Sequence, residues 1–139
     1  WVAPATPLAG GVEDPRVVKF TRHIDLGWLR ILDVKKAMAV RGWDHQGSVT
    51  FHVVDPMGYA EGTWRVDVEA PGAPATVTKV DDSTDAATLD VAALGSLYFG
   101  MGRGFSLAAA HRITGTDEQI AAVDRMFSTV DVAHNISEF

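Results

Sequence analysis

The residue types that most often carry catalysis or bind metals are few in this sequence and widely spaced. Its five histidines stand at positions 23, 45, 52, 111 and 134. No two of them are four residues apart and no His-Glu-x-x-His motif occurs, so the spacing that presents metal ligands on one helix face is missing. The chain also has no cysteine and no Gly-x-Ser-x-Gly motif. These patterns predict no metal site, no disulfide and no serine nucleophile.

Two short segments have the composition of ligand-binding loops but not the pattern. Gly100-Met101-Gly102-Arg103-Gly104 follows an expected helix, whereas a dinucleotide-binding loop follows a strand and spaces its third glycine differently. Asp81, Asp82 and Asp85 lack the spacing and the final glutamate of a calcium loop. We therefore predict a flexible turn between helices and a solvated turn between strands. By local chemistry alone, the chain is predicted to hold no complete active site.

Composition and charge indicate a single globular domain that does not bind nucleic acid. Of its 139 residues, 47% are hydrophobic and 22% are charged, which supports one domain with a substantial core. Eighteen acidic and 12 basic residues give a net charge of −6. This balance leaves no basic stripe to bind phosphates, and an acidic surface attracts cationic partners. Because no apolar run reaches about 18 residues and no signal-peptide pattern is present, we expect a soluble, cytoplasmic protein without a membrane span.

The two ends of the chain differ in character. The chain starts with Trp1 rather than methionine, and residues 1–16 are rich in proline and glycine without any period. We predict that residues 1–24 link the chain to a preceding domain and that residues 25–139 form the domain proper. The opposite end is Glu138-Phe139, with an aromatic final residue and no polar tail. Since most chain ends fray, an aromatic end is unusual.

Hydrophobic periodicity predicts an α+β fold. Period-2 alternation and apolar runs predict strands, and 3.6-residue spacing with capping residues predicts helices. The capping box Thr116–Gln119 gives the clearest helix start. The expected order is strand 28–32, helix 34–41, strands 48–55, 63–69, 75–80 and 86–91, helices 91–99 and 106–112, and a final helix after 116. We expect an antiparallel or mixed sheet of about five strands with helices on one face and polar residues on the other.

Five stretches, taken in order along the chain, carry a family resemblance. They are residues 14–18, residues 28–34 with Ala37 and Arg41-Gly42, residues 88–100, residues 121–127, and the ending Glu138-Phe139. The set resembles the C-terminal domain of Eis-type acetyltransferases, the enhanced intracellular survival proteins. The first stretch resembles the family's crossover out of its central domain. The resemblance covers residues 14–139, nearly the whole chain.

The resemblance implies a fold and a place in a larger enzyme. Proteins of this family carry two GNAT-type acetyltransferase domains followed by a sterol-carrier-protein-like domain, which this chain would be. They transfer acetyl from acetyl-CoA to amines of polycationic substrates such as aminoglycosides, and they assemble as hexamers. The acetyl-CoA site and the tyrosine acid belong to the missing N-terminal domain. By this resemblance the isolated domain is expected to be inactive.

The resemblance also assigns roles to the last two residues. It implies that the terminal carboxylate of Phe139 is the general base and that Glu138 contacts the cationic substrate. An α-carboxylate has a reference pKa of about 3.3–3.7 and is a poor base in water, but burial raises its pKa. The Phe139 ring would anchor the carboxylate in an apolar slot. The alternative interpretation is an aromatic end that only covers exposed core.

Two functions of other classes remain open. The sterol-carrier fold can enclose an apolar tunnel between its sheet and its helices that holds a lipid. The residues that could line such a tunnel, or could equally form a filled core, are Leu97, Tyr98, Phe99, Phe105, Leu107 and Met126. The domain could also be a scaffold that only holds an oligomer together through the polar face of its sheet. Neither a lipid carrier nor a scaffold needs a particular last residue, whereas the acetyltransferase reading fails if the chain end is extended.

Overall fold

The computed structural model describes residues 9–19, 21 and 28–130. The chain divides into two units, one of residues Trp1–Trp28 with Asp131–Phe139 and one of residues Leu29–Val130. In the first unit, the described residues form the short 3₁₀ helices Ala9–Gly11 and Pro15–Val17. The predicted boundary between residues 24 and 25 lies outside the described residues.

The second unit contains the sheet and the α-helices. In chain order its elements are α1 (Val34–Val40), β1 (Gly47–Val54), β2 (Gly62–Val68), β3 (Thr76–Val80), β4 (Ala87–Asp90), α2 (Val91–Tyr98), α3 (Gly104–Ala109), β5 (Ile113–Thr114) and α4 (Asp117–Phe127). The α+β class predicted from the sequence is confirmed. The predicted caps are also present, since Asp33, Asp90 and Thr116 accept hydrogen bonds from the first turns of α1, α2 and α4.

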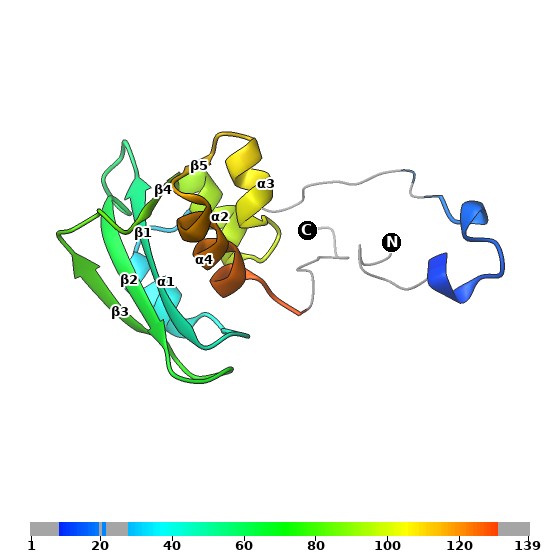
Figure 1. Cartoon of the computed structure of the whole chain (residues 1–139), viewed down its shortest axis with the longest axis horizontal. Helices are drawn as coiled ribbons and strands as arrows, with labels where there is room; N and C mark the ends of the chain where they lie inside the picture. Colours follow the sequence, from blue (N-terminus) through cyan, green and yellow to red (C-terminus); the bar gives the residue numbers. More distant parts are fainter. Residues whose placement is uncertain (1–8, 20, 22–27, 131–139) are drawn as a thin grey trace. The chain divides into compact units, whose positions relative to one another are not determined.

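The sheet is mixed and has the strand order β3-β2-β1-β4-β5 (Figure 1). β1 pairs antiparallel with β2, and β2 pairs antiparallel with β3. β4 lies on the other side of β1 and pairs with it in parallel, from Phe51↔Ala87 to Val54↔Asp90. The β2–β3 hairpin therefore forms one flank of the sheet, and α2 begins directly where β4 ends.

The predicted strand 28–32 is wrong, and the fifth strand is a different segment. Residues 28–32 form no strand, although the side chains alternate as in one: Trp28 is 96% exposed, Ile31 4% and Leu32 58%. This segment packs Leu29 and Ile31 on the core without joining the sheet. The fifth strand is β5, which pairs antiparallel with β4. With only two residues, β5 is too short to produce a periodic signal.

The third predicted helix begins and ends earlier than expected. It was expected over 106–112, and α3 spans Gly104–Ala109. His111 has a φ of 56°, a left-handed conformation that a continuing helix does not allow. The helix therefore ends before His111, and the following residues turn back into β5.

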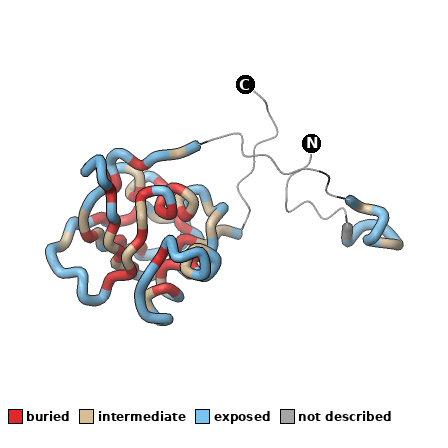
Figure 2. The backbone as a smooth tube through the Cα atoms, turned by 90° about the horizontal axis from the view of Figure 1, so that it is seen from above, coloured by how far each residue is buried: buried red, intermediate tan, exposed pale blue. Residues whose placement is uncertain are grey.

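One face of the sheet forms the core. On β1, the side chains of Val49, Phe51 and Val53 are buried, and the register places Val66 of β2 and Leu89 of β4 on the same face. Figure 2 shows the buried residues gathered inside this unit. Helices α1, α2 and α4 add buried side chains to the same hydrophobic cluster. This arrangement confirms the predicted helices on one face.

The opposite face of the sheet is polar. Ser48, Arg65 and Asp67 form a hydrogen-bonded group on β1 and β2, with Arg65 Nε 3.0 Å from Asp67 Oδ2. This group stabilises the carboxylate, so the pKa of Asp67 lies below its ordinary value, first through the Arg65 hydrogen bond. The predicted division into an apolar and a polar sheet face is therefore observed within the described residues.

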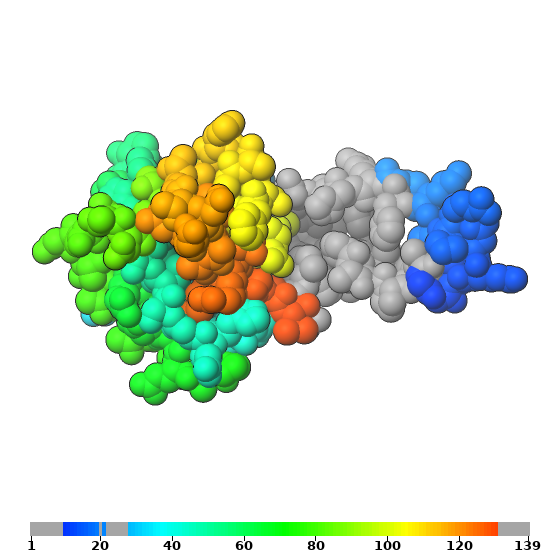
Figure 3. Space-filling view, viewed as in Figure 1, coloured from blue at the N-terminus to red at the C-terminus, as the bar shows by residue number. Residues whose placement is uncertain are grey.

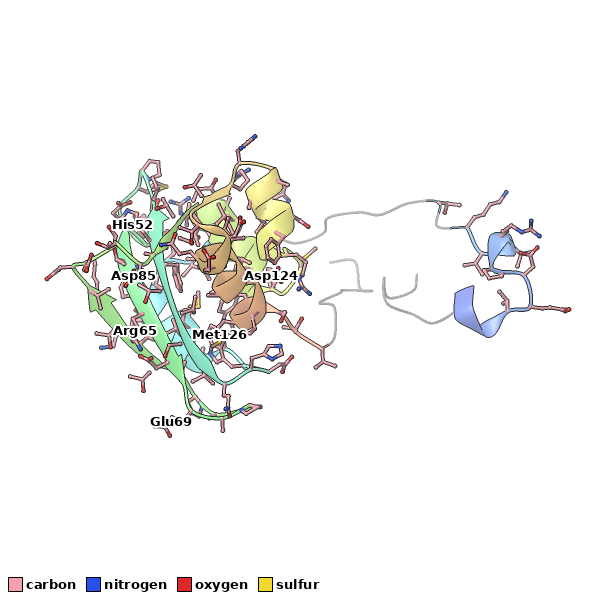
Figure 4. The ribbon with its side chains drawn as sticks, viewed as in Figure 1. His52, Arg65, Glu69, Asp85, Asp124 and Met126 are labelled. Carbon is pink, nitrogen blue, oxygen red and sulfur yellow. The ribbon has the colours of Figure 1, made fainter. Side chains whose placement is uncertain are left out.

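Helix α3 packs closely against α4 at Gly104. A Cβ atom added to Gly104 would lie 2.9 Å from the Cβ of Asp124 and 3.0 Å from its Cα and N. At this point the carboxylate of Asp124, which is labelled in Figure 4, accepts hydrogen bonds from main-chain N–H groups at the start of α3 and from the Arg103 side chain. Glycine is the residue that this approach requires.

We expect Gly104→Ala to lower the free energy of unfolding by about 1–3 kcal/mol, the usual cost of adding volume to a packed site. Gly42→Ala is the matched control, because a Cβ there meets no atom within 4 Å. Its effect should stay within about 0.5 kcal/mol. Urea unfolding followed by tryptophan fluorescence measures both variants. Equal stability of the two would contradict the close approach of α3 to α4.

Candidate functional site

The predicted site residues Glu138 and Phe139 lie outside the described residues. The structure does describe the point from which their segment starts, at the end of α4 and in residues 128–130. These residues and their contacts in the Leu29–Val130 unit form the described part of the candidate site. Figure 3 shows residues near 130 in red-orange at the edge of this unit.

The end of α4 is fixed in the core by an aromatic cluster. Phe127, the last residue of the helix, is fully buried. Its ring makes edge-to-face contacts with Trp43, at 5.3 Å between centroids, and with Phe51, at 5.6 Å. Such pairs add about 0.5–1.5 kcal/mol beyond the area they bury. The main chain leaving α4 therefore starts from a well-determined position.

Arg41 is a buried cation that joins the ends of two helices. Its side chain donates to the carbonyl oxygens of Tyr98 at 3.1 Å, Phe127 at 2.8 Å and Gly42 at 2.9 Å. Tyr98 and Phe127 are the last residues of α2 and α4, where unpaired carbonyls give a helix its negative end. The guanidinium also lies over the Trp43 ring, 4.5 Å from its centroid.

Burial and charge act in opposite directions on Arg41. Burial lowers the pKa of its guanidinium, and the nearby Asp44 carboxylate raises it. Arginine keeps its proton in proteins, so the charge at the two helix ends is permanent. The cation therefore stabilises both helix ends at every accessible pH.

Residues beyond α4 are held by the loop that follows α1. Ser128 Oγ lies 3.0 Å from His45 Nε2 and 2.8 Å from the carbonyl oxygen of Arg125. A hydroxyl has one hydrogen and here donates it to that carbonyl, so His45 Nε2 is the donor to Ser128. The main-chain N–H of Val130 donates to Asp44 Oδ2 at 2.8 Å.

Gly100 makes room for the same segment. It adopts a φ of 70°, and an added Cβ would lie 2.6 Å from the Oγ1 atom of Thr129. Residues 99–103 thus form the turn between α2 and α3, and Gly100 in this turn leaves space for the Thr129 side chain. Arg103 in this turn is hydrogen-bonded to Asp124, so it already has an anionic partner.

A second polar group lies on the polar face of the sheet. His52 Nδ1 is 3.0 Å from Thr63 Oγ1, and His52 Nε2 is 3.8 Å from a Glu61 carboxylate oxygen. The order resembles a nucleophile, base and acid, but Thr63 is buried. A substrate would not reach the Thr63 hydroxyl, so we interpret these contacts as links between β1 and β2 rather than as a catalytic group.

The neighbouring β1–β2 loop is organised by a buried carboxylate. Asp55 accepts hydrogen bonds from the main-chain N–H groups of Met57, at 3.0 Å, and Ala60, at 2.9 Å, and from the Arg30 side chain. These bonds hold the pKa of the Asp55 carboxyl below its ordinary value, with the Ala60 bond contributing most. The carboxylate is therefore a stable loop anchor.

The acidic segment that contains Asp82, predicted to be a solvated turn between strands, is a local turn. Asp82 accepts from the main-chain N–H of Thr84 at 2.8 Å and from its hydroxyl at 2.6 Å. Across the part of the chain that the structure describes, no three His, Cys, Asp or Glu side chains gather as metal ligands. Within the same residues, no helix has the length and hydropathy to cross a membrane.

The six residues considered for an apolar tunnel separate into three groups. Leu97 and Met126 are fully buried members of the core, Tyr98 and Leu107 pack at its edge, and Phe99 and Phe105 are exposed. Two of the six therefore face solvent, so the set does not surround one interior space.

Sequence analysis missed the residues that hold the segment after α4. Arg41 entered only as part of the family resemblance, and Asp44 and His45 were not singled out. A turn that follows a short helix has no period, and its partners at 127–130 lie more than 80 residues away. The one local signal for Arg41 is its position as a charged residue among apolar ones, directly after Val40 and two residues before Trp43.

Comparison with known protein families identifies the domain type. A family profile described as sterol carrier protein domain matches residues 34–134. An uncharacterized N-acetyltransferase of Streptomyces avermitilis is 37% identical over 123 residues, which are 88% of this chain and 29% of that protein. N-acetyltransferase Eis of Mycobacterium tuberculosis is 32% identical over 120 residues, which are 84% of this chain and 28% of that protein. The chain thus spans less than a third of these relatives.

Solved structures agree with this comparison. The crystal structure of Eis1 from Mycobacterium abscessus matches 98% of this chain and 34% of its own, with a TM-score of 0.81 and 30% identity. A GCN5-related N-acetyltransferase from Kribbella flavida matches 74% of this chain and 26% of its own, with a TM-score of 0.64 and 28% identity. These likenesses confirm the sterol-carrier-protein-like fold and the resemblance to Eis-type acetyltransferases.

The pairing of α4 with Arg103 gives a pH-dependent prediction. Arg103 holds the pKa of the Asp124 carboxyl below its ordinary value of 3.8. A carboxyl with a lowered folded-state pKa stabilises the fold above its unfolded pKa, and this stabilisation is lost as the pH falls through the folded value. Arg103→Gln should lower the free energy of unfolding by about 1 kcal/mol at neutral pH, and this difference should shrink below about pH 4.

Arg125→Gln is the control, because it removes the same charge from an exposed position on α4. Chemical unfolding at a series of pH values measures both variants against the unchanged chain. A difference for Arg103→Gln that persists unchanged in acid would show that the Asp124 pair is not its cause.

Proposed function

This chain belongs to the sterol carrier protein domain family, and we propose that it is the C-terminal domain of an acetyl-CoA-dependent N-acetyltransferase. The observation that carries the proposal is the match of 98% of the chain to the Eis1 structure, which is about three times longer. Relatives that carry the same domain at their matched region are named N-acetyltransferases. The acetyl-CoA site would then lie in preceding GNAT domains, and the isolated chain would be inactive.

In this proposal the terminal carboxylate of Phe139 acts as the general base. The segment starts at Val130, whose main chain is held by Asp44. Nine further residues, if extended, reach about 30 Å, enough to enter a site built by another domain. A carboxylate that leaves water for an apolar site gains proton affinity, and a substrate ammonium beside it is its proton donor. A base positioned in this way is worth about 10²–10⁴-fold in rate.

The proposed substrate is a polycationic amine of the aminoglycoside class, with Glu138 as a contact to a second ammonium group. The acidic balance of the chain, −6 overall, supports a cationic substrate, because a negative field raises its local concentration. We further propose that the full-length protein is a cytoplasmic homo-oligomer, a hexamer as the family resemblance implies.

The chain end is tested by extension. In the full-length protein, one glycine added after Phe139 moves the terminal carboxylate by one residue while leaving every side chain in place. We expect acetyl-CoA turnover with an aminoglycoside to fall by about a hundredfold, within the range of a lost general base. The melting temperature should not change. Equal turnover of both forms would rule out the terminal carboxylate as the general base and would favour a scaffold role for the domain.

Glu138 is tested separately, through binding. Glu138→Gln removes the charge and keeps the size of the side chain. We expect KM for the amine to rise about tenfold, with kcat changed far less, since a contact made equally before and during reaction affects binding alone. Asp85→Asn in the exposed β3–β4 turn is the matched control for charge. A fall in kcat with an unchanged KM would assign Glu138 a different role.

A further inference from the structure

We propose that Arg41, Asp44 and His45 form a clasp that fixes the origin and starting direction of the segment after α4, and thereby positions the base at its end. This inference rests on the proposed function of the Phe139 carboxylate. The three are positioning residues, because they act through the main chain and lie far from the reacting atoms in sequence.

The clasp holds successive groups of the chain as it leaves α4. Arg41 binds the carbonyl oxygen of Phe127 at 2.8 Å, and His45 Nε2 lies 3.0 Å from the hydroxyl of Ser128. Asp44 accepts from the N–H of Val130 at 2.8 Å. Two of the three contacts are to main-chain atoms, so the clasp sets the path of the backbone.

The contact between Asp44 and Val130 lies at the surface and contributes little to the core. Val130 is 85% exposed, and its bond to Asp44 is also exposed. A surface hydrogen bond of this kind adds little to stability, and chain segments beyond a last helix ordinarily fray. Holding the backbone here is useful chiefly to whatever follows in the chain.

Holding the origin matters because the proposed reaction depends on the far end of a long segment. Nine residues from Val130, if extended, would reach about 30 Å, so a change in direction of about 10° at the origin would displace their end by about 5 Å. A misplacement of about 1 Å can lower a rate about a hundredfold. A fixed origin also reduces the freedom that the segment loses when its end is bound.

The test uses the full-length protein with changes at Asp44. Asp44→Ala removes the acceptor for the Val130 N–H, whereas Asp44→Asn keeps an oxygen acceptor and removes only the charge. We expect kcat/KM for the amine to fall about ten- to a hundredfold in Asp44→Ala and to stay within about threefold in Asp44→Asn. Asp85→Ala, which removes the same charge from an exposed turn, should leave turnover unchanged.

The same changes are then combined with the added C-terminal glycine. If the clasp acts through the terminal carboxylate, Asp44→Ala should cause no further loss in the extended protein. An equal loss in both backgrounds would overturn the positioning role, because it would show that Asp44 acts on the enzyme by another route.

Hydrogen exchange gives a readout that does not depend on activity. In Asp44→Ala, the peptide covering residues 128–139 should exchange about tenfold faster, while the peptide covering 117–127 and both peptides of Asp85→Ala stay unchanged. Unchanged exchange over 128–139 would overturn the clasp. If the glycine extension leaves turnover intact, the carboxylate proposal fails by itself, and exchange still decides whether the clasp holds the segment.

Discussion

A buried guanidinium at the meeting point of two helix ends sets the arrangement of the domain. Arg41 is 7% exposed and places its hydrogen bonds on main-chain carbonyls at the ends of α2 and α4. Removing a cation from water costs several kcal/mol, and the cost is offset only when its donors all find acceptors in good geometry. The two helix ends, the turn after α1 and the rings of Trp43 and Phe127 therefore have to be in place together.

The sheet separates a well-formed apolar core from a polar surface whose charged groups are paired. One face supplies the core, and on the other the charged side chains pair with each other, as Arg65 does with Asp67. Within the described residues, no buried side-chain nitrogen or oxygen lacks a hydrogen-bond partner. Catalytic sites usually contain unpaired or strongly perturbed groups. A domain in which these groups are satisfied suits the role of holding something else in place.

That role agrees with the proposal that this chain is one domain of a longer enzyme. Its helices pack on a mixed sheet, and α4, the last of them, ends in the aromatic cluster around Phe127. A rigid support of this kind is needed if a chain segment is to present a carboxylate to a site formed elsewhere, since catalytic groups are held by elements with little freedom. The fold and the proposed chemistry are thus linked through the end of α4.

The amino-acid sequence alone determined the local structure of this protein. The alternation in 48–55 and 63–69 and the caps at Asp33, Asp90 and Thr116 specify strands and helices, because both depend on neighbours a few residues away. The family resemblance rested on stretches of the same local kind, and it directed attention to Glu138 and Phe139, which lie outside the described residues.

Only the tertiary structure decided which segments share the sheet and what holds the chain after α4. The apolar run at 28–32 predicted a strand, yet this segment lies on the core without a strand partner, while the two-residue β5 completes the sheet. Arg41, Asp44 and His45 meet residues 127–130 across more than 80 positions. Such contacts form because the core brings together two turns that are distant in the sequence. Neither turn contains a periodic pattern or a motif that predicts this contact.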